Sequence, residues 1–365
     1  MRRFLPLLLA LLAACADVPV SGGVTPELAR PALTPPPGPA KAKWVVVISV
    51  DGLRPDAIEA APAPALLGMM KQGASCDKAE TIRPSITLPS HTAMLSGLDY
   101  QRHGISWNNY RAGHFGHPSV FTVTTQAGKQ AAMFFSKDKF NYLAHPAAVA
   151  YVWGQPVPPV IPAAEDYNDL AWVERRQKYY QENERRAEAG QPPLPDPDRK
   201  PVPPGTPLVR TPEHKTSAEN LGRMFAAEWP AHDWAMTFVH IREPDEAGHL
   251  KGWMGLEYLN GVRRADKGVA RILEAIRASG RAGETAVILS ADHGGLGRDH
   301  YKLFEPNRKE NVTIPWICIG PGVPAGLKID RIVRTFDTMP TALAFLGLGA
   351  PEGIDGKPVL EVLTK

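Results

Sequence analysis

The sequence predicts an α/β sandwich with a mostly parallel central sheet. Short runs rich in β-branched and other apolar residues recur without polar alternation, as in parallel strands covered on both faces. Helical patterns separate these runs. A length of 365 residues, with 44% hydrophobic and 22% charged residues, excludes wholesale disorder, collagen and a multi-span membrane protein. The expected strands cover 44–50, 131–136, 234–241, 285–290 and 313–319, and the expected helices cover 56–72, 89–97, 256–279 and 337–346.

Charge and cysteine content restrict the partners. A net charge of +3, without a long run of one sign, gives no reason to expect a nucleic acid polymer as partner, whereas a small anionic substrate remains open. Three cysteines are too few for a disulfide scaffold and lack zinc-finger spacing. Whether Cys76 and Cys318 pair is left open by the sequence.

The N-terminus has the form of a bacterial export signal. A basic start precedes an apolar run at 4–12, which is too short to span a bilayer permanently. The run ends in Leu-Ala-Ala-Cys, which resembles a lipobox, so we expect a signal peptide over 1–14 and a lipid on Cys15. Ordinary cleavage after Ala16 is the alternative. The mature protein is then expected in the bacterial cell envelope, as a periplasm-facing lipoprotein anchored to the membrane through Cys15.

Many of the 37 prolines fall into two parts of the chain. The first part, 15–42, predicts an extended tether, because proline runs favour stiff polyproline II and cannot build a core. The folded domain is then expected to span 43–365.

The first expected strand is followed by Asp51 and Gly52, a carboxylate and a turn residue at a strand end. Alone, this pair is typical of an ordinary turn. Farther on, Pro89 is expected as the first residue of a helix, which puts Thr87 beside a helix N-terminus that favours negative charge. A hydroxyl there could act as a nucleophile, or Thr87 or Ser90 could simply cap the helix.

The second proline-rich part, at about 155–212, interrupts the alternation of strands and helices and predicts an insertion with one helix at 169–189. Its aromatic residues suggest two interpretations. Either Trp172, Tyr179 and Tyr180 cap the site and stack on a leaving group, or the insertion is a peripheral decoration.

Two further polar clusters follow expected strands. After 234–241, Asp245 and His249 stand four residues apart, so that one turn of helix would point both toward a shared metal. After 285–290 come Asp292 and His293, with another Asp-His pair shortly beyond them. Oxygen and nitrogen ligands without thiolate suit Zn²⁺ or Mn²⁺. Any one histidine is more simply a hydrogen-bonded side chain, but the clusters together predict a metal site.

In this order, the motifs resemble those of the alkaline phosphatase superfamily, and most closely its type I phosphodiesterase and nucleotide pyrophosphatase family. The resemblance runs from about residue 45 to 349 and is broken by the insertion. Its motifs are Asp51-Gly52, Thr87-x-Pro89-x-His91, Ser96-Gly97, His103-Gly104-Ile105, Pro244-Asp245-x-x-Gly248-His249, Asp292-His293-Gly294 and His300.

The resemblance implies an alkaline phosphatase-like α/β/α sandwich with two divalent metal ions, expected to be Zn²⁺ with Mn²⁺ as the alternative. Larger members place their last ligand farther along the chain, but no histidine lies downstream of His300. Asn108 matches the family's asparagine that contacts a phosphoryl oxygen. The implied ligands are Asp245, His249 and His300 for one metal, and Asp51, Asp292, His293 and the Thr87 oxygen for the other.

The implied reaction is hydrolysis of a small phosphate ester or nucleotide, most closely by a phosphodiesterase. A metal bound to the Thr87 hydroxyl lowers its pKa, and the resulting phospho-Thr87 is hydrolysed by water activated beside Asp245.

Four alternatives stay open. Phosphonate hydrolysis uses the same site, and a phosphomonoesterase could use Lys137 or Lys139 for the extra charge, although both could be surface lysines. A sulfatase needs a modifiable Cys or Ser where Thr87 stands, and an Arg in place of His91. From a different class, the chain could be an inactive lipid-anchored binding protein, against which the complete set of ligands argues.

Overall fold

A computed structural model of the chain describes residues 30–154, 182, 217–300 and 309–363. The expected signal peptide, the helix expected at 169–189 and the aromatic residues of the insertion lie outside the described residues. Within the described part of the chain, no helix is long and apolar enough to cross a membrane.

Eight strands of the described chain form one sheet in the order β4-β3-β5-β1-β6-β7-β2-β8. β1 pairs in parallel with both β5 and β6, and β3 pairs in parallel with β5 and β4. The predicted mostly parallel sheet is thus confirmed. The strands are β1 (Trp44–Val50), β2 (Ala74–Glu80), β3 (Gln130–Phe135), β4 (Tyr151–Gly154), β5 (Trp234–Ile241), β6 (Thr285–Ser290), β7 (Thr313–Ile319) and β8 (Leu327–Lys328).

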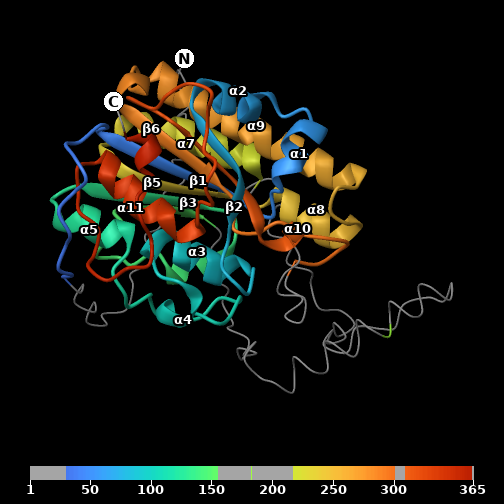
Figure 1. Cartoon of the computed structure of the whole chain (residues 1–365), viewed down its shortest axis with the longest axis horizontal. Helices are drawn as coiled ribbons and strands as arrows, with labels where there is room; N and C mark the ends of the chain where they lie inside the picture. Colours follow the sequence, from blue (N-terminus) through green and yellow to red (C-terminus); the bar gives the residue numbers. More distant parts are fainter. Residues whose placement is uncertain (1–29, 155–181, 183–216, 301–308, 364–365) are drawn as a thin grey trace, which may run out of the picture.

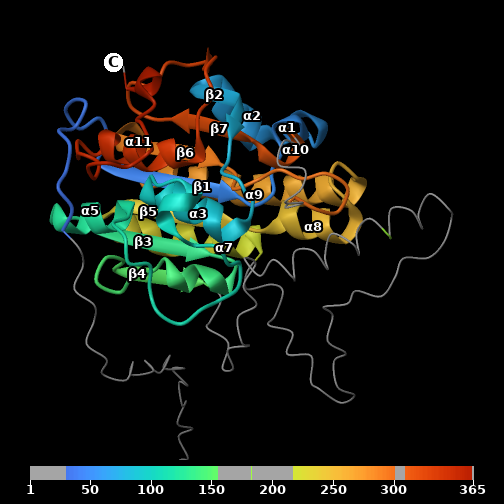
Figure 2. The same cartoon turned by 60° about the horizontal axis from the view of Figure 1, so that its bottom comes forward.

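Helices cover both faces of the sheet, which confirms the expected α/β/α sandwich. One layer contains α2, α7 and α9, and the other contains α3, α5 and α11 (Figures 1 and 2). The helices are α1 (Pro55–Ala60), α2 (Pro64–Gln72), α3 (Thr87–Ser96), α4 (Tyr100–His103), α5 (Val120–Gln126), α7 (Ala218–Glu228), α8 (Glu243–Lys251), α9 (Leu256–Ala278), α10 (Lys309–Val312) and α11 (Thr338–Phe345).

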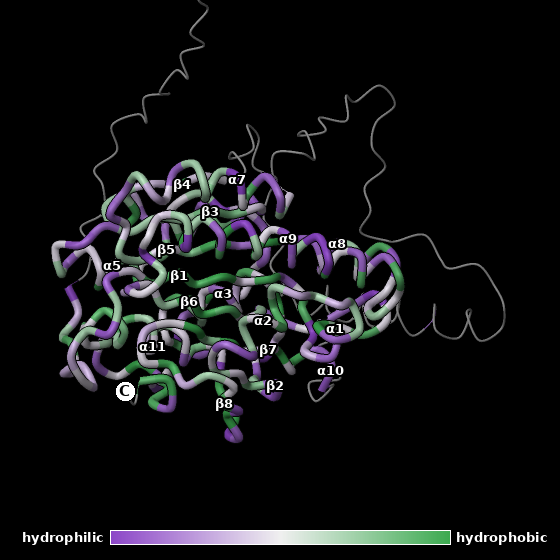
Figure 3. Tube along the Cα trace, turned by 90° about the horizontal axis from the view of Figure 1, so that it is seen from above, coloured by the Kyte–Doolittle hydropathy of each residue, from purple (hydrophilic) through white to green (hydrophobic). Residues whose placement is uncertain are grey.

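The central strands form the core because both of their faces are covered. Every residue of β5 and β6 is buried, and in β1 only Trp44 is partly exposed. β1 crosses the middle of the molecule as a largely hydrophobic tube (Figure 3). The continuous apolar runs in the sequence reflect this two-sided burial.

Two helix predictions need correction. The helix expected at 56–72 is two helices, α1 and α2, because the prolines at 62 and 64 remove backbone donors, and Pro64 instead begins α2. The helix expected to begin at Pro89 begins at Thr87. Pro89 is tolerated because amides in the first turn have no partner within the helix. Thr87 therefore belongs to the first helical turn itself.

The sheet also differs from expectation at one side. β7 was expected among parallel strands but runs antiparallel to β6 and β2. β2, β4 and β8 were not predicted, because they are short or mix polar with apolar residues, as in the sequence ASCDKAE of β2. Cys76 and Cys318 lie on β2 and β7 as buried free thiols.

The described end of the expected tether contacts the domain. Thr34 donates its backbone N–H to the carbonyl oxygen of Ala350, and Glu352 donates to Ala32. Ala42, at the end of this segment, is buried and donates to Phe345. The chain is therefore fixed to the domain before β1 begins.

Candidate active site

Four parallel strands lie side by side in the order β3, β5, β1 and β6, so their carboxyl ends meet at one edge of the sheet. Charged side chains follow each of them. Asp51 comes directly after β1, Lys137 and Asp292 come two residues after β3 and β6, and Asp245 lies in the first turn of α8, after β5. Ligand sites of α/β sheets typically lie at such an edge.

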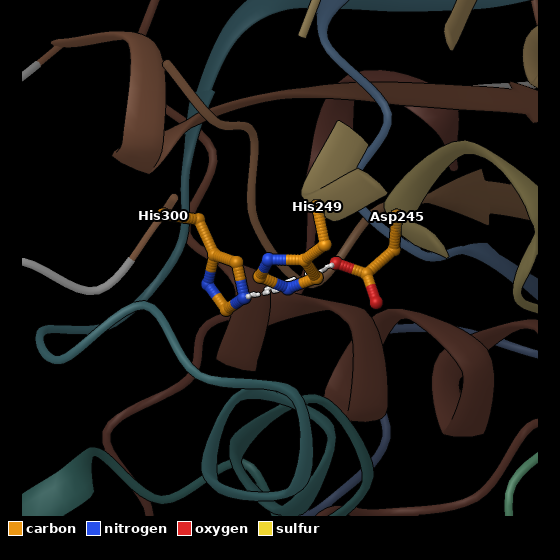
Figure 4. Close-up of side chains that lie close together, drawn as sticks. All are labelled: Asp245, His249 and His300. Atoms are coloured by element: carbon orange, nitrogen blue, oxygen red, sulfur yellow. Dashed lines mark hydrogen bonds and ion pairs between the residues drawn. The ribbon is translucent and has the colours of Figure 1, made fainter. Parts of the chain in front are cut away.

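The structure brings the six carboxylate and imidazole ligands expected from the sequence into two groups. In each group, the potential ligand atoms all lie within 4.8 Å of one another. We call Asp51, Asp292 and His293 the closed triad, because all three are fully buried. Figure 4 shows the other three side chains, of Asp245, His249 and His300, close together, and we call them the open triad because His249 is exposed.

All three triad histidines are held in the tautomer that suits a metal. In each ring Nδ1 bonds a backbone carbonyl oxygen, which can only accept, so Nδ1 must carry the proton. Nε2 of the neutral ring then presents its lone pair to the triad, as metal-binding histidines do. The acceptors are Arg298 for His249 (3.1 Å), Gly294 for His293 (2.9 Å) and Ser85 for His300 (2.6 Å).

The histidine rings themselves leave a place for a cation. Nε2 of His300 lies 3.1 Å from Nε2 of His249, and the rings of His293 and His300 stack with their centroids 3.5 Å apart. Two nitrogen lone pairs repel each other at such a distance unless a proton or a metal ion lies beside them. Burial, followed by the neighbouring His293, holds the pKa of His300 well below its usual range and thus favours the neutral ring.

Each of the three buried carboxyl groups has an oxygen without a hydrogen-bond partner among the described residues. Asp51 Oδ1, Asp245 Oδ1 and Asp292 Oδ2 are buried without a hydrogen-bond partner, as is His293 Nε2. Burial and the charge of Asp51 hold the pKa of Asp292 well above its usual range. Unpaired buried carboxylates are costly, so this donor set fits divalent cations.

Lys137 joins the two triads. Its Nζ lies 2.6 Å from Asp51 Oδ2 and 2.7 Å from Asp245 Oδ2, and only 16% of its side chain is exposed. Burial acts to lower the pKa of Lys137, but the two carboxylates raise it above its ordinary value, so the ammonium stays charged. One ammonium faces three carboxylates, which leaves room for further positive charge.

Thr87 is buried in the first turn of α3, and its hydroxyl makes no hydrogen bond to any residue the structure describes. His91 fixes this turn, because its Nδ1 donates to the carbonyl oxygen of Thr87 at 2.7 Å and lies 3.6 Å from Asp292 Oδ2. The Oδ1 of Asn108 accepts from the amide of Leu88 at 2.9 Å. Thr87 and Asn108 are therefore linked to each other and to the closed triad.

Gly52 lets the two triads approach each other. Its φ of +72° is in the left-handed region, and an added Cβ would lie 2.9 Å from the Cα of Asp245. Its amide donates to Asp292 Oδ1, and its carbonyl accepts from Trp253 and Tyr258. The Asp-Gly pair is thus part of the site and more than a turn.

Sequence reasoning missed two side chains of this site. His240 donates from Nε2 to Asp51 Oδ2 at 2.9 Å, and its Nδ1 lies 3.0 Å from Ser136 Oγ. Lys137 was offered, with Lys139, only as a group for the extra charge of a phosphate monoester or as a surface lysine, and its ion pairs with the two triads were not foreseen. The sequence did indicate both positions: His240 lies at the carboxyl end of β5, which precedes Asp245, and Lys137 follows β3, which neighbours β5.

The α/β/α sandwich and these two candidate metal-binding triads define a hydrolase of the alkaline phosphatase kind. The family model "Type I phosphodiesterase / nucleotide pyrophosphatase" matches residues 45–308. The chain belongs to this family, and with it to the phosphoryl and sulfuryl ester hydrolases of the alkaline phosphatase superfamily.

Solved structures support the fold. Murine ectonucleotide pyrophosphatase/phosphodiesterase 5, solved as an inactive variant with AMP, superposes with a TM-score of 0.60 at 12% identity, covering 88% of this chain and 98% of that one. A phosphonate monoester hydrolase from Silicibacter pomeroyi superposes with a TM-score of 0.56 at 18% identity, covering 88% and 76%.

Curated relatives match only in part. Arylsulfatase K of Xenopus laevis is 30% identical over 101 residues, which are 27% of this chain and 19% of that protein. Arylsulfatase K of Homo sapiens is 33% identical over 78 residues, 21% of this chain and 15% of that protein. The chain therefore aligns with less than a fifth of the length of these relatives.

Proposed function

We propose that the chain is a two-zinc phosphodiesterase of the nucleotide pyrophosphatase type, with Thr87 as the nucleophile and Mn²⁺ as the alternative metal. The observation that carries the proposal is the orientation of the three triad histidines, each with Nδ1 held by a backbone carbonyl and Nε2 facing carboxylates. Zinc ions held by Asp51, Asp292 and His293 and by Asp245, His249 and His300 would supply Lewis acidity at the phosphoryl group.

The chain's own groups fit an in-line displacement. The Thr87 oxygen forms the bond to phosphorus while the bond to the leaving oxygen breaks, giving a phospho-Thr87 that still carries the second ester group and an alcohol that takes up the Thr87 proton. The backbone N–H of Thr87 and the Nδ2 group of Asn108, which have no hydrogen-bond partner among the described residues, suit the phosphoryl oxygens. Water then attacks the phosphorus of phospho-Thr87, the bond to the Thr87 oxygen breaks, and the phosphate monoester leaves as the hydroxyl is restored. Water can reach the site from the side of the exposed His249.

Substitution of Thr87 tests this function. With zinc supplied, wild type should hydrolyse bis-p-nitrophenyl phosphate and a nucleotide 5′-p-nitrophenyl ester faster than p-nitrophenyl phosphate, phosphonoacetate or p-nitrophenyl sulfate. Thr87→Ala should lose about 10³-fold or more in kcat, as removal of a covalent nucleophile does, while Thr87→Ser keeps part of the activity. A Thr87→Ala protein with most of its activity would refute the assignment.

Hydrolysis of phosphate monoesters or phosphonates is the second candidate, and the position of Lys137 favours it. The ammonium lies between the triads, where it could offset the second negative charge of a monoester. A kcat/KM for p-nitrophenyl phosphate that exceeds the value for the diesters would make the monoester reading the better one.

We also propose that the mature chain is exported and anchored through a lipid on Cys15. The support is the lipobox-like sequence at the end of the apolar run. Labelled palmitate should enter the wild-type protein in a bacterial host and should be absent from Cys15→Ser. Equal labelling of the two proteins would reject the anchor.

A further inference from the structure

An aromatic and cationic surface lies beside the proposed phosphoryl site and has no role in the chemistry above. The guanidinium carbon of Arg111 stands 4.1 Å from the ring centroid of Trp107, and this ring meets Tyr142 edge to face at a centroid distance of 5.4 Å. Stacking fixes the plane of the Arg111 guanidinium, which prepares it for bidentate binding of an oxyanion.

This surface holds donors without acceptors. Trp107 Nε1 and Arg111 Nε are buried without a hydrogen-bond partner, and in the described chain no carboxylate pairs with Arg111. The segment 104–119 has no Asp or Glu. A buried N–H without an acceptor is costly, so a ligand that supplies oxygen acceptors would relieve this cost.

The surface is fixed close to the reacting group. Trp107 directly precedes Asn108, whose side chain bonds the first turn of α3 at Leu88, next to Thr87. Tyr142 closes the 3-10 helix η1 (Asp138–Tyr142), which follows Lys137. A group esterified to the phosphoryl centre can therefore extend over the Trp107 ring.

Lys139 supplies a second cation near this surface. It shares η1 with Tyr142, and Lys137, Asp51 and Asp245 are among the charged groups that act on its ammonium. Its side chain is half-buried, and among the described residues it has no carboxylate partner, whereas Lys137 has two. Arg111 and Lys139 thus both lack an ion-pair partner among the described residues, and segment 104–119 contributes no carboxylate.

We propose that Arg111, Trp107 and Lys139 form a binding site for a second oxyanion of the substrate, a phosphate or a carboxylate carried beyond the scissile phosphoryl group. This inference rests on the proposed function, because it places a phosphate ester in the site. The site would favour phosphate esters whose esterified group carries a further negative charge over esters of the same size whose esterified group is neutral.

Binding ratios test the site independently of hydrolysis. Isothermal titration calorimetry of zinc-loaded protein compares thymidine 3′,5′-bisphosphate with thymidine 5′-phosphate, and 2-carboxyethyl phosphate with propyl phosphate. The second anion should raise affinity about tenfold, as one charge-assisted hydrogen bond does. A gain in either pair supports the site and identifies phosphate, carboxylate or both as the anion that it takes.

Variants locate the effect. Arg111→Met and Lys139→Met should each lower the gain, and the double variant should abolish it, whereas Arg111→Lys keeps part of it. Trp107→Phe keeps an aromatic ring beside Arg111 but removes the indole N–H with its five-membered ring, and it should keep part of the gain. Arg223→Met, on the exposed side of α7, is the matched control and should keep the full gain.

Two outcomes would overturn the site: equal affinity for both members of each pair in wild type, or a gain that survives in the folded double variant. The affinity ratios do not depend on turnover, so they can also be measured with Thr87→Ala. If wild type shows the gain in affinity but the predicted loss of activity in Thr87→Ala is not found, the proposed chemistry fails while this binding site stands.

Discussion

The closed and open triads are built from the same residue types, yet they differ in exposure. Asp51, Asp292 and His293 are all fully buried, whereas in the open triad the side chain of His249 is 40% exposed. The closed ligands directly follow the central strands β1 and β6, and the open ones come from α8 and from the loop after β6. The depth of each group in the sheet edge therefore sets its access to water.

This difference indicates a division of roles. A fully buried set of ligands loses its cation slowly and excludes competing water, while an exposed set can keep a position for water, as catalytic zinc sites do. Lys137 forms an ion pair with one carboxylate of each triad, so that the six carboxylate and imidazole groups can pack at one edge of the sheet. We expect the closed triad to be the more sensitive of the two to substitution.

The largest expected effect compares one histidine from each triad. His293→Ala should lower kcat by about 10³-fold, because a metal supplies several kcal/mol of charge stabilisation and each 1.36 kcal/mol is tenfold in rate. His249→Ala should lose about tenfold less, since water can take its exposed position. Initial rates at saturating zinc, with bound zinc determined by mass spectrometry, measure both variants. Equal losses of kcat in the two variants would contradict the expected difference between the closed and open triads.

Next comes the lysine between the triads. Lys137→Met should destabilise the metal-free protein by about 3–5 kcal/mol, the usual cost of removing one partner from a buried ion pair. Zinc should reduce this deficit, because the metal ions then offset the charges of Asp51 and Asp245. Urea denaturation with and without zinc measures the effect, and a deficit that zinc leaves unchanged would contradict it.

The contrast between strands and loops also explains what the sequence could predict. The apolar runs of β5, β6 and β7 gave their bounds, because burial on both faces leaves a continuous pattern. β2 was missed, since its sequence alternates irregularly, and the direction of β7 depends on contacts distant in the chain.

For the site, the order of the motifs predicted the six triad residues, but it did not predict the side chains that support them. His240 lies inside an apolar strand and has no neighbouring motif, so only the register of β5 against β1 places it beside Asp51. In the sequence, Lys137 and Lys139 are two equivalent loop lysines. Only the folded structure shows that Lys137 pairs with two carboxylates.

A smaller effect is expected for His240, which bonds Asp51 of the closed triad. His240→Ala removes the donor to Asp51 Oδ2 and should lower zinc affinity of the closed triad by about 10–100-fold, as loss of such supporting bonds does. His240→Gln, which can place an N–H at the same point, should restore part of it. Competition with a zinc chelator measures both sites, and loss at the open triad alone would contradict the assignment.

The smallest effect on stability is expected for an ion pair on the surface, Lys78 with Asp330, which is as short as the pair of Lys137 with Asp51. Lys78 Nζ lies 2.6 Å from Asp330 Oδ1, the distance found between Lys137 and Asp51, but water surrounds both groups. The hydrogen bond from Lys78 lowers the pKa of Asp330, so any stabilisation is present above the ordinary pKa of an aspartate and is lost as the pH falls through the lowered value.

Exposure makes that contribution small, because water and salt screen the pair. Lys78→Met and Asp330→Asn should therefore leave the free energy of unfolding at pH 7 within experimental error of wild type, and the three proteins should give the same curve down to pH 3. If Lys78→Met cost as much as Lys137→Met at pH 7, distance rather than burial would govern these pairs, and the argument that burial distinguishes the closed from the open triad would lose its basis.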